Sequence, residues 1–131
     1  MSRRELREQI FKLLFRVEFN KFEDMPEQEE LFFEQEDAAQ GEDADYISSK
    51  YNKICQKLTE LDTMLDEKAK GWNTGRMSKV DLTILRLAVY EIKYDDAVPA
   101  SVAINEAVEL AKKFGQDASS GFVNGILAKF V

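Results

Sequence analysis

The first stretch of the chain carries apolar residues at the spacing of an amphipathic helix. Leu6, Ile10, Leu13, Leu14 and Val17 recur every three or four positions, which places them on one helical face. A second stripe on another side of the same helix consists of four phenylalanines, Phe11, Phe15, Phe19 and Phe22. Two interpretations follow. The helix is covered on both sides and both stripes belong to the core, which we favour for the stripe as a whole, or Phe15 stays exposed beside Arg4.

The middle of the chain carries an apolar seam with alternating steps of four and three residues. Its members are Ile47, Tyr51, Ile54, Leu58, Leu61 and Leu65. Such a repeat over nearly three heptads predicts one long helix, from about Asp43 to Ala69. The seam could pair with a second copy of the chain as a homodimer, but packing within its own bundle is favoured.

The remaining segments also favour helices. Pro26 predicts the start of a short helix, and residues 34–45 are predicted to connect it to the long one. Residues 77–94 are apolar on most sides, which is typical of a central buried helix. A further helix is expected between Pro99 and Gly115, and a final one carries the apolar residues of 122–130, capped by Asp117 or Ser119. The fold class predicted is all-α, with six or seven helices.

Composition narrows the class of protein. With 131 residues the chain is expected to form a single domain, 1–131, or two small lobes that share a core. The absence of histidine and the presence of one cysteine, Cys55, make zinc sites, Cys-His nucleophiles and internal disulfides implausible. No phosphate-binding glycine loop, signal peptide or membrane-spanning run is found. Carboxylates are abundant and leave a carboxylate-only catalytic site open, but no pair of them stands out. We therefore expect a cytoplasmic protein that is not an enzyme and needs no cofactor or metal.

The net charge of −7 hides a strong asymmetry along the chain. Residues 1–21 carry six basic side chains against three acidic ones, a balance of +3, so the remaining residues sum to −10. Residues 22–45 hold eleven acidic groups and no lysine or arginine. A basic first helix on an acidic body is a localised electrostatic footprint, which an isoelectric point alone would miss. Phe15, beside those arginines, could stack on an unpaired base.

Four motifs, in order along the chain, resemble the NusB family of transcription antitermination factors. They are R-x-x-R-E at Arg4–Glu8, the run from Arg76 to Glu91 that contains D-x-x-I-L-R-L-A-x-Y-E, VAINEAVELAKKFG at Val102–Gly115, and FVNGIL at Phe122–Leu127. Residues 22–70 match mainly in helical character. The resemblance implies a fold of two small helical sub-bundles.

What the resemblance implies about function is binding of the boxA element of ribosomal RNA transcripts, together with NusE, a ribosomal small-subunit protein. The pair would join the RNA polymerase antitermination complex. The RNA surface implied consists of the first helix and the start of the last, with these residues: Arg3, Arg4, Arg7, Lys12, Phe15, Gln116, Ser119 and Phe122. The NusE surface implied consists of Arg76, Lys79, Asp81 and Arg86.

Other residues of the motifs have simpler explanations. Arg86, Glu91, Asn105, Glu106 and Asn124 interrupt apolar helices, and we expect them to be buried side chains that brace helices. At Ala118 and Gly121 family members often carry an acidic residue and a lysine, so no charged contact is expected there.

Two alternatives remain open. One is a helical scaffold that binds proteins and has little affinity for RNA. The other is a module related to the NusB-like domain of RNA cytosine methyltransferases, whose catalytic domain this sequence does not contain.

Overall fold

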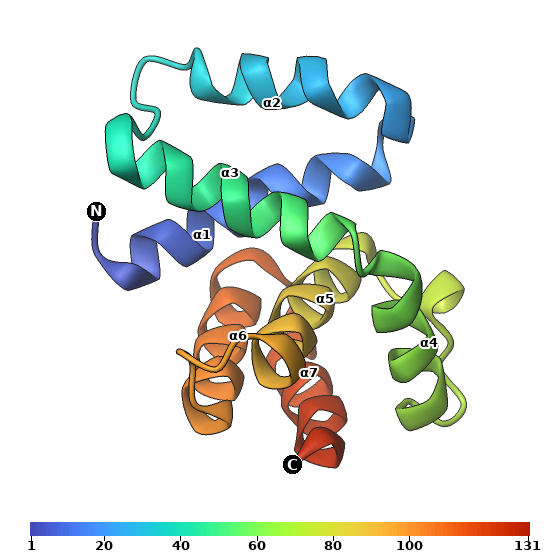
Figure 1. The fold of residues 1–131 in the computed structure, drawn as a ribbon. Coiled ribbons are helices and arrows are strands. Elements are labelled where there is room, and N and C mark those ends of the chain that lie inside the picture. The colour runs from blue at the N-terminus through green and yellow to red at the C-terminus, as the bar shows by residue number, and fades with distance from the viewer. The chain divides into compact units, whose positions relative to one another are not determined.

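A computed structural model describes all 131 residues and contains seven α-helices and no strand, which confirms the predicted fold class. Figure 1 shows their order along the chain. The helices are α1 (Arg3–Phe15), α2 (Met25–Phe33), α3 (Gly41–Cys55), α4 (Leu58–Lys68), α5 (Lys79–Tyr94), α6 (Ala100–Phe114) and α7 (Ser119–Leu127). Short 3-10 turns lie at η1 (Arg16–Glu18), η2 (Phe22–Asp24), η3 (Thr74–Arg76) and η4 (Ala128–Phe130). No helix is long and apolar enough to cross a bilayer.

The helices form two compact units, Met1–Cys55 and Gln56–Val131. In the first unit, α1 packs against α3. Ile10, Leu13, Leu14, Ile47 and Ile54, which were assigned to the buried faces of the two helices, are fully buried. Polar contacts attach α2 to α3, because the Glu29 carboxylate accepts hydrogen bonds from Ser48 and Asn52.

In the second unit, α5 is the central helix and contacts α4, α6 and α7. Ten consecutive residues of α5, from Leu82 to Glu91, are buried, as its apolar character on most sides predicted. Its start is fixed by Ser78, whose hydroxyl accepts a hydrogen bond from the Asp81 amide at 3.1 Å. α6 and α7 also pack on each other, so α5, α6 and α7 share one core.

The prediction of one long helix from Asp43 to Ala69 is wrong. The helix ends at Cys55 and a new one begins at Leu58, and the boundary between the two units lies at the same place. Five of the six seam residues are nevertheless buried, with Ile54 and Leu61 fully inaccessible, and only Leu58, the first residue after the break, is half-buried. Periodic burial was predicted correctly, and helical continuity was not, because neither proline nor glycine marks residues 56 and 57.

The polar residues within the C-terminal motifs do not share one environment. Arg86 and Glu91 are buried, as expected, with 8% and 1% of their surfaces accessible. Asn105 and Asn124 are exposed, so the prediction that they are buried braces is wrong, whereas Glu106 is half-buried and its bracing role stays a prediction. The two asparagines lie on the outward sides of α6 and α7, which the apolar spacing around them did not reveal.

Candidate nucleic-acid interface

The basic side chains of the first unit are displayed by a helix whose start is firmly fixed. The Ser2 hydroxyl accepts a hydrogen bond from the Glu5 amide, and the Glu5 carboxylate accepts one from the Ser2 amide. This reciprocal capping satisfies two of the amides that a helix start leaves without partners. Helical geometry therefore begins directly ahead of the arginines.

The predicted RNA-binding residues of α1 differ in accessibility. Arg3, Arg4 and Lys12 are exposed, and Arg7 is half-buried. The Lys12 ammonium lies 3.5 Å from the Glu8 carboxylate, one turn away, and exposed pairs of this kind contribute little to stability. Because the guanidinium groups of Arg3 and Arg4 reach solvent, α1 can present at least two permanent positive charges to a phosphate chain.

The phenylalanine stripe is graded, so neither of the two interpretations holds for all its members. Phe11 is buried, Phe15 is half-buried, and Phe19 and Phe22 are exposed, with 60% and 57% of their surfaces accessible. The Phe15 ring stacks on Phe11 at 5.9 Å between centroids and meets Phe19 edge-on at 4.9 Å. Phe15 is thus held by its neighbours while part of its surface remains accessible.

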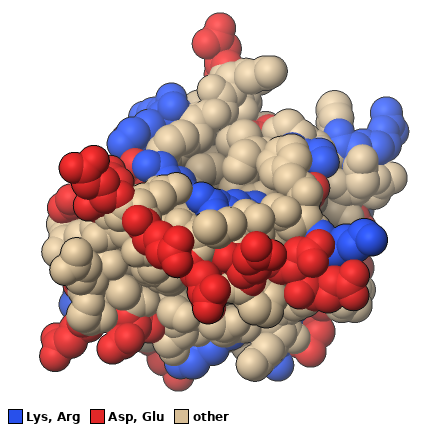
Figure 2. Space-filling view, turned by 90° about the horizontal axis from the view of Figure 1, so that it is seen from above, with Lys and Arg blue, Asp and Glu red and all other residues tan.

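Acidic side chains border this helix in the sequence and gather at the surface. Figure 2 looks onto the side on which α2 lies in Figure 1 and shows a band of acidic groups across that face. Nine of the eleven acidic residues between 22 and 45 are exposed, and only Glu29 and Asp43 are half-buried. Such a face repels a phosphate backbone, so it is an unfavourable surface for RNA.

The start of α7 is built differently from the start of α1. Its N-cap is Ala118, which makes no side-chain hydrogen bond, so the prediction that Asp117 or Ser119 caps this helix is wrong. The Ser119 side chain instead turns back and accepts a hydrogen bond from the Gln116 amide at 3.0 Å. That turn requires a glycine before it, because a Cβ atom on Gly115 would lie 2.5 Å from the Ser119 side chain.

The three predicted RNA-binding residues of α7 and its approach therefore lie in different environments. Gln116 is exposed, Phe122 is half-buried, and Ser119 has only 5% of its surface accessible. Ser119 thus holds the turn in shape, and its contact with RNA stays a prediction. Phe122 packs edge-on against Trp72, with 5.7 Å between the ring centroids.

The residues expected at a protein-partner surface are also divided by burial. Arg76 and Lys79 are exposed and Asp81 is half-buried near the start of α5. One carboxylate oxygen of Asp81 is buried and accepts no hydrogen bond. Arg76 and Lys79 can be reached by a partner from solvent, and their role stays a prediction.

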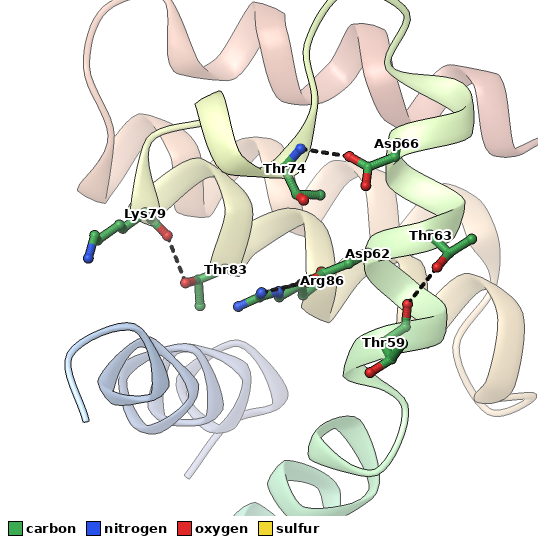
Figure 3. Close-up of polar contacts among 8 residues, drawn as sticks. All are labelled: Thr59, Asp62, Thr63, Asp66, Thr74, Lys79, Thr83 and Arg86. Carbon is green, nitrogen blue, oxygen red and sulfur yellow. Dashed lines mark hydrogen bonds and ion pairs between the residues drawn. The ribbon is translucent and has the colours of Figure 1, made fainter. Parts of the chain in front are cut away.

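Arg86 already has a partner within the chain. Its guanidinium donates through Nε and Nη2 to the two carboxylate oxygens of Asp62 on α4, both at 2.8 Å. Figure 3 shows this paired geometry between α5 and α4. A planar two-point pair of this kind is strong and geometrically specific. In this structure Arg86 therefore joins two helices of the second unit, and only 8% of its surface is accessible.

Sequence reasoning missed two residues that the structure makes prominent. Asp62 belongs to no recognised motif and lies 24 positions before Arg86, so no local pattern in the sequence connects the two. Trp72 marked only a break between helices, yet half of its surface is accessible and it lies against Phe122. A single tryptophan in a polar loop is the signal that could have identified it. No cluster of residues able to hold a metal ion is present.

Comparison with known proteins assigns the family. The sequence profile of the NusB family matches residues 4–131. The chain is 53% identical to the transcription antitermination protein NusB of Agathobacter rectalis, over 99% of both chains, and 38% identical to that of Listeria monocytogenes, over 98% and 94%. It resembles the solved structure of Thermotoga maritima NusB with a TM-score of 0.87, at 33% identity over 99% of this chain and 90% of that one.

A second solved structure has the same fold at 21% identity and a TM-score of 0.84, over 98% of this chain and 94% of that one. It is described as antitermination factors NusB and NusE in complex with double-stranded RNA. Together, the profile match over nearly the whole chain and the relatives above 30% identity show that the chain belongs to the NusB family.

Proposed function

We propose that this chain is a transcription antitermination factor that binds boxA RNA of ribosomal RNA transcripts together with NusE. Its curated relatives are antitermination proteins, and a structure of the same fold contains NusE and RNA. The observation in this chain that carries the proposal is the arrangement of α1. Exposed arginines follow a fixed helix start, while the next stretch of sequence is acidic and largely exposed.

The proposed mechanism is binding of RNA and NusE in the cytoplasm, without catalysis. Arginine side chains of α1 neutralise phosphates and release counterions, which makes the affinity depend on salt. Phe15, whose ring is held between two others but is partly accessible, offers a face on which an unpaired base can stack. The start of α7 supplies further contacts from Gln116 and Phe122.

NusE is expected to use the exposed charges near the start of α5. Arg76 and Lys79 are exposed there, and the buried carboxylate oxygen of Asp81 accepts no hydrogen bond within the chain. Arg86 would contribute indirectly, by fixing α4 against α5 through Asp62.

The competing function is a helical scaffold that binds proteins and has little affinity for RNA, which the net charge of −7 favours. Fluorescence anisotropy with labelled boxA RNA and a scrambled RNA, with and without NusE and over a range of salt concentrations, separates the two. An RNA-binding factor prefers boxA, binds it more tightly with NusE present, and loses affinity as salt rises. A scaffold shows no preference under any of these conditions.

A double charge reversal, Arg4→Glu with Arg7→Glu, tests whether α1 is the RNA-binding site. We expect at least a tenfold loss of boxA affinity and, for two lost phosphate contacts, a salt slope lower by about 1.4. The control is Lys53→Glu with Lys93→Glu, which changes the net charge equally at exposed positions outside both predicted surfaces. If the two double variants lose affinity equally, the effect is one of total charge and α1 is not the site.

A further inference from the structure

A small open groove lies within the second unit, between α7 and the loop that follows α4. Its volume is about 270 Å³, and it is lined by Ala69, Lys70, Trp72, Gly121, Phe122, Gly125, Ile126 and Lys129. Gly121 and Gly125 are one helical turn apart on α7, and a Cβ atom at either would have no heavy atom within 4 Å. The groove is therefore open because positions 121 and 125 of α7 carry no side chain.

The tryptophan at this groove is held by the loop that carries it. Gly71 has a φ of 84°, which glycine adopts readily, and the Trp72 amide donates to the Ala69 carbonyl at 2.8 Å. Farther along the loop, the Asp66 carboxylate accepts a hydrogen bond from the Thr74 amide at 2.7 Å, a contact drawn in Figure 3. The loop is thus anchored on both sides of Trp72.

Packing fixes the indole ring without covering it. Phe122 meets the ring edge-on at 74°, and the Arg76 guanidinium lies 5.8 Å from its centroid. Both arrangements are favourable aromatic contacts. Half of the Trp72 surface nevertheless remains accessible. A large aromatic ring that is oriented by its neighbours and open to solvent is suited to stacking on a planar ligand.

The charges around the groove indicate what that ligand carries. Lys70 and Lys129 line it, and Arg76 lies against its tryptophan. The Lys129 ammonium is positioned at the groove by a hydrogen bond to the Lys68 carbonyl at 3.1 Å. Basic groups beside an exposed aromatic ring are the combination by which proteins hold single-stranded nucleic acid. The volume is slightly below the range of about 300–1,000 Å³ that is typical of small-molecule sites, which suits a single base.

We propose that this groove receives one unstacked base of a bound RNA, with Trp72 as the platform on which the base stacks. The inference rests on the proposed RNA-binding function and extends it from Phe122, which lines the groove, to a site that includes Trp72 and Gly125. Lys70 and Lys129 neutralise the phosphates that flank the base. Gly125 is a specificity-determining position, because a bulky side chain there occupies the space of the base, whereas a single methyl group still leaves room for it.

The chain offers a direct spectroscopic test, because Trp72 is its only tryptophan. Unlabelled boxA RNA is titrated into the full chain with NusE while tryptophan fluorescence is followed, with NusE alone as the blank. Anisotropy of labelled RNA is measured in parallel. Stacking quenches the fluorescence along the same curve as binding. Binding without quenching leaves the RNA-binding function standing and overturns the groove proposal, whereas absence of binding defeats both.

Two pairs of variants test the groove independently of fluorescence. Trp72→Ala is expected to weaken RNA binding about fivefold or more, the lower end of what one stacked base contributes, while Trp72→Phe retains most of the affinity. Gly125→Leu, which fills the groove, should weaken binding similarly, and its matched control Gly125→Ala should not. Thermal unfolding verifies that each variant is folded. If these variants weaken NusE binding and leave RNA affinity unchanged, the groove belongs to the protein partner and the proposal is wrong.

Discussion

The start of α1 and the start of α7 are both predicted to contact RNA, but they are built on different principles. At α1, Ser2 and Glu5 cap each other, and the side chains that follow carry charge into solvent. At α7 no side chain caps the helix, and a serine next to its start is buried in the turn before it. The start of α1 therefore presents charged side chains, and the start of α7 presents a backbone turn that is followed by the aromatic ring of Phe122.

This difference suggests separate roles for the two helix starts, one in the affinity for RNA and the other in the choice among bases. Charges on a well-capped helix attract any phosphate chain, so α1 is expected to supply the salt-dependent part of binding. A turn whose shape depends on Gly115 and Ser119, with Phe122 one turn farther, has no cation of its own and is expected to select among bases. Variants at the two starts should therefore differ in kind as well as in size.

The largest effect on stability is expected away from both starts, at the pair formed by Arg86 and Asp62. Asp62→Ala removes the carboxylate that accepts two hydrogen bonds from a buried guanidinium, and it should lower the free energy of unfolding by about 3 kcal/mol. Urea denaturation measures this, with Glu67→Ala on the same helix as an exposed control expected to stay within about 0.5 kcal/mol. The RNA affinity of the folded protein should not change. A folded Asp62→Ala variant with lost RNA affinity would place RNA contacts in α4 or α5 and break the comparison.

The next effect concerns the turn before α7. In Gly115→Ala the new methyl group meets both the Ser119 side chain, at 2.5 Å, and the Ala111 carbonyl, at 2.8 Å. Forcing them apart should lower the free energy of unfolding by about 1–3 kcal/mol. Gly125→Ala, ten residues on in the middle of α7, has open space and should gain about 0.5–1 kcal/mol from its higher helix propensity. Equal effects at the two glycines in thermal unfolding would show that the turn tolerates a side chain.

The smallest effect is a pH dependence of the first turn of α1. Hydrogen bonds from the backbone and side chain of Ser2 lower the pKa of Glu5 below its usual value. A lowered pKa means that the carboxylate stabilises the folded helix above its unfolded pKa of about 4.5 and that this contribution disappears as pH falls through the folded value. Amide hydrogen exchange of residues 3–6, corrected for intrinsic rates, should show protection that decreases below pH 4.5. In Ser2→Ala that decrease should be weaker, and an unchanged profile would exclude the capping pair as its cause.

The fold could be predicted from the sequence where periodicity reports burial. Apart from Leu58, which is half-buried, the seam from Ile47 to Leu65 lies in the interior as predicted, yet the chain turns within it at residues 56 and 57. The turn keeps Ile54 and Leu61 on buried faces of two separate helices, so the apolar repeat in the sequence continues although the helix does not. Periodicity of side chains cannot distinguish one helix from two when no glycine or proline marks the turn.

The site was predictable only as far as charge and motif order determine it. The basic cluster of α1 follows from counting charges along the chain. The partner of Arg86, the burial of Ser119 and the exposure of Asn105 and Asn124 depend on how helices pack, which the local pattern does not encode. Trp72 is the clearest case, because its meaning comes from Phe122, fifty residues later in the chain.

The boundary between the two units has a consequence for synthesis. Because the chain passes from one unit to the other only once, after Cys55, all residues of α1, α2 and α3 precede every residue of the second unit. Chains are synthesised at about 5–20 residues per second, and N-terminal domains generally fold first as they emerge. The basic helix thus leaves the ribosome several seconds before Val131, surrounded by ribosomal RNA. The acidic residues of 22–45 emerge directly behind it, so a negatively charged segment accompanies α1 before the second unit is made.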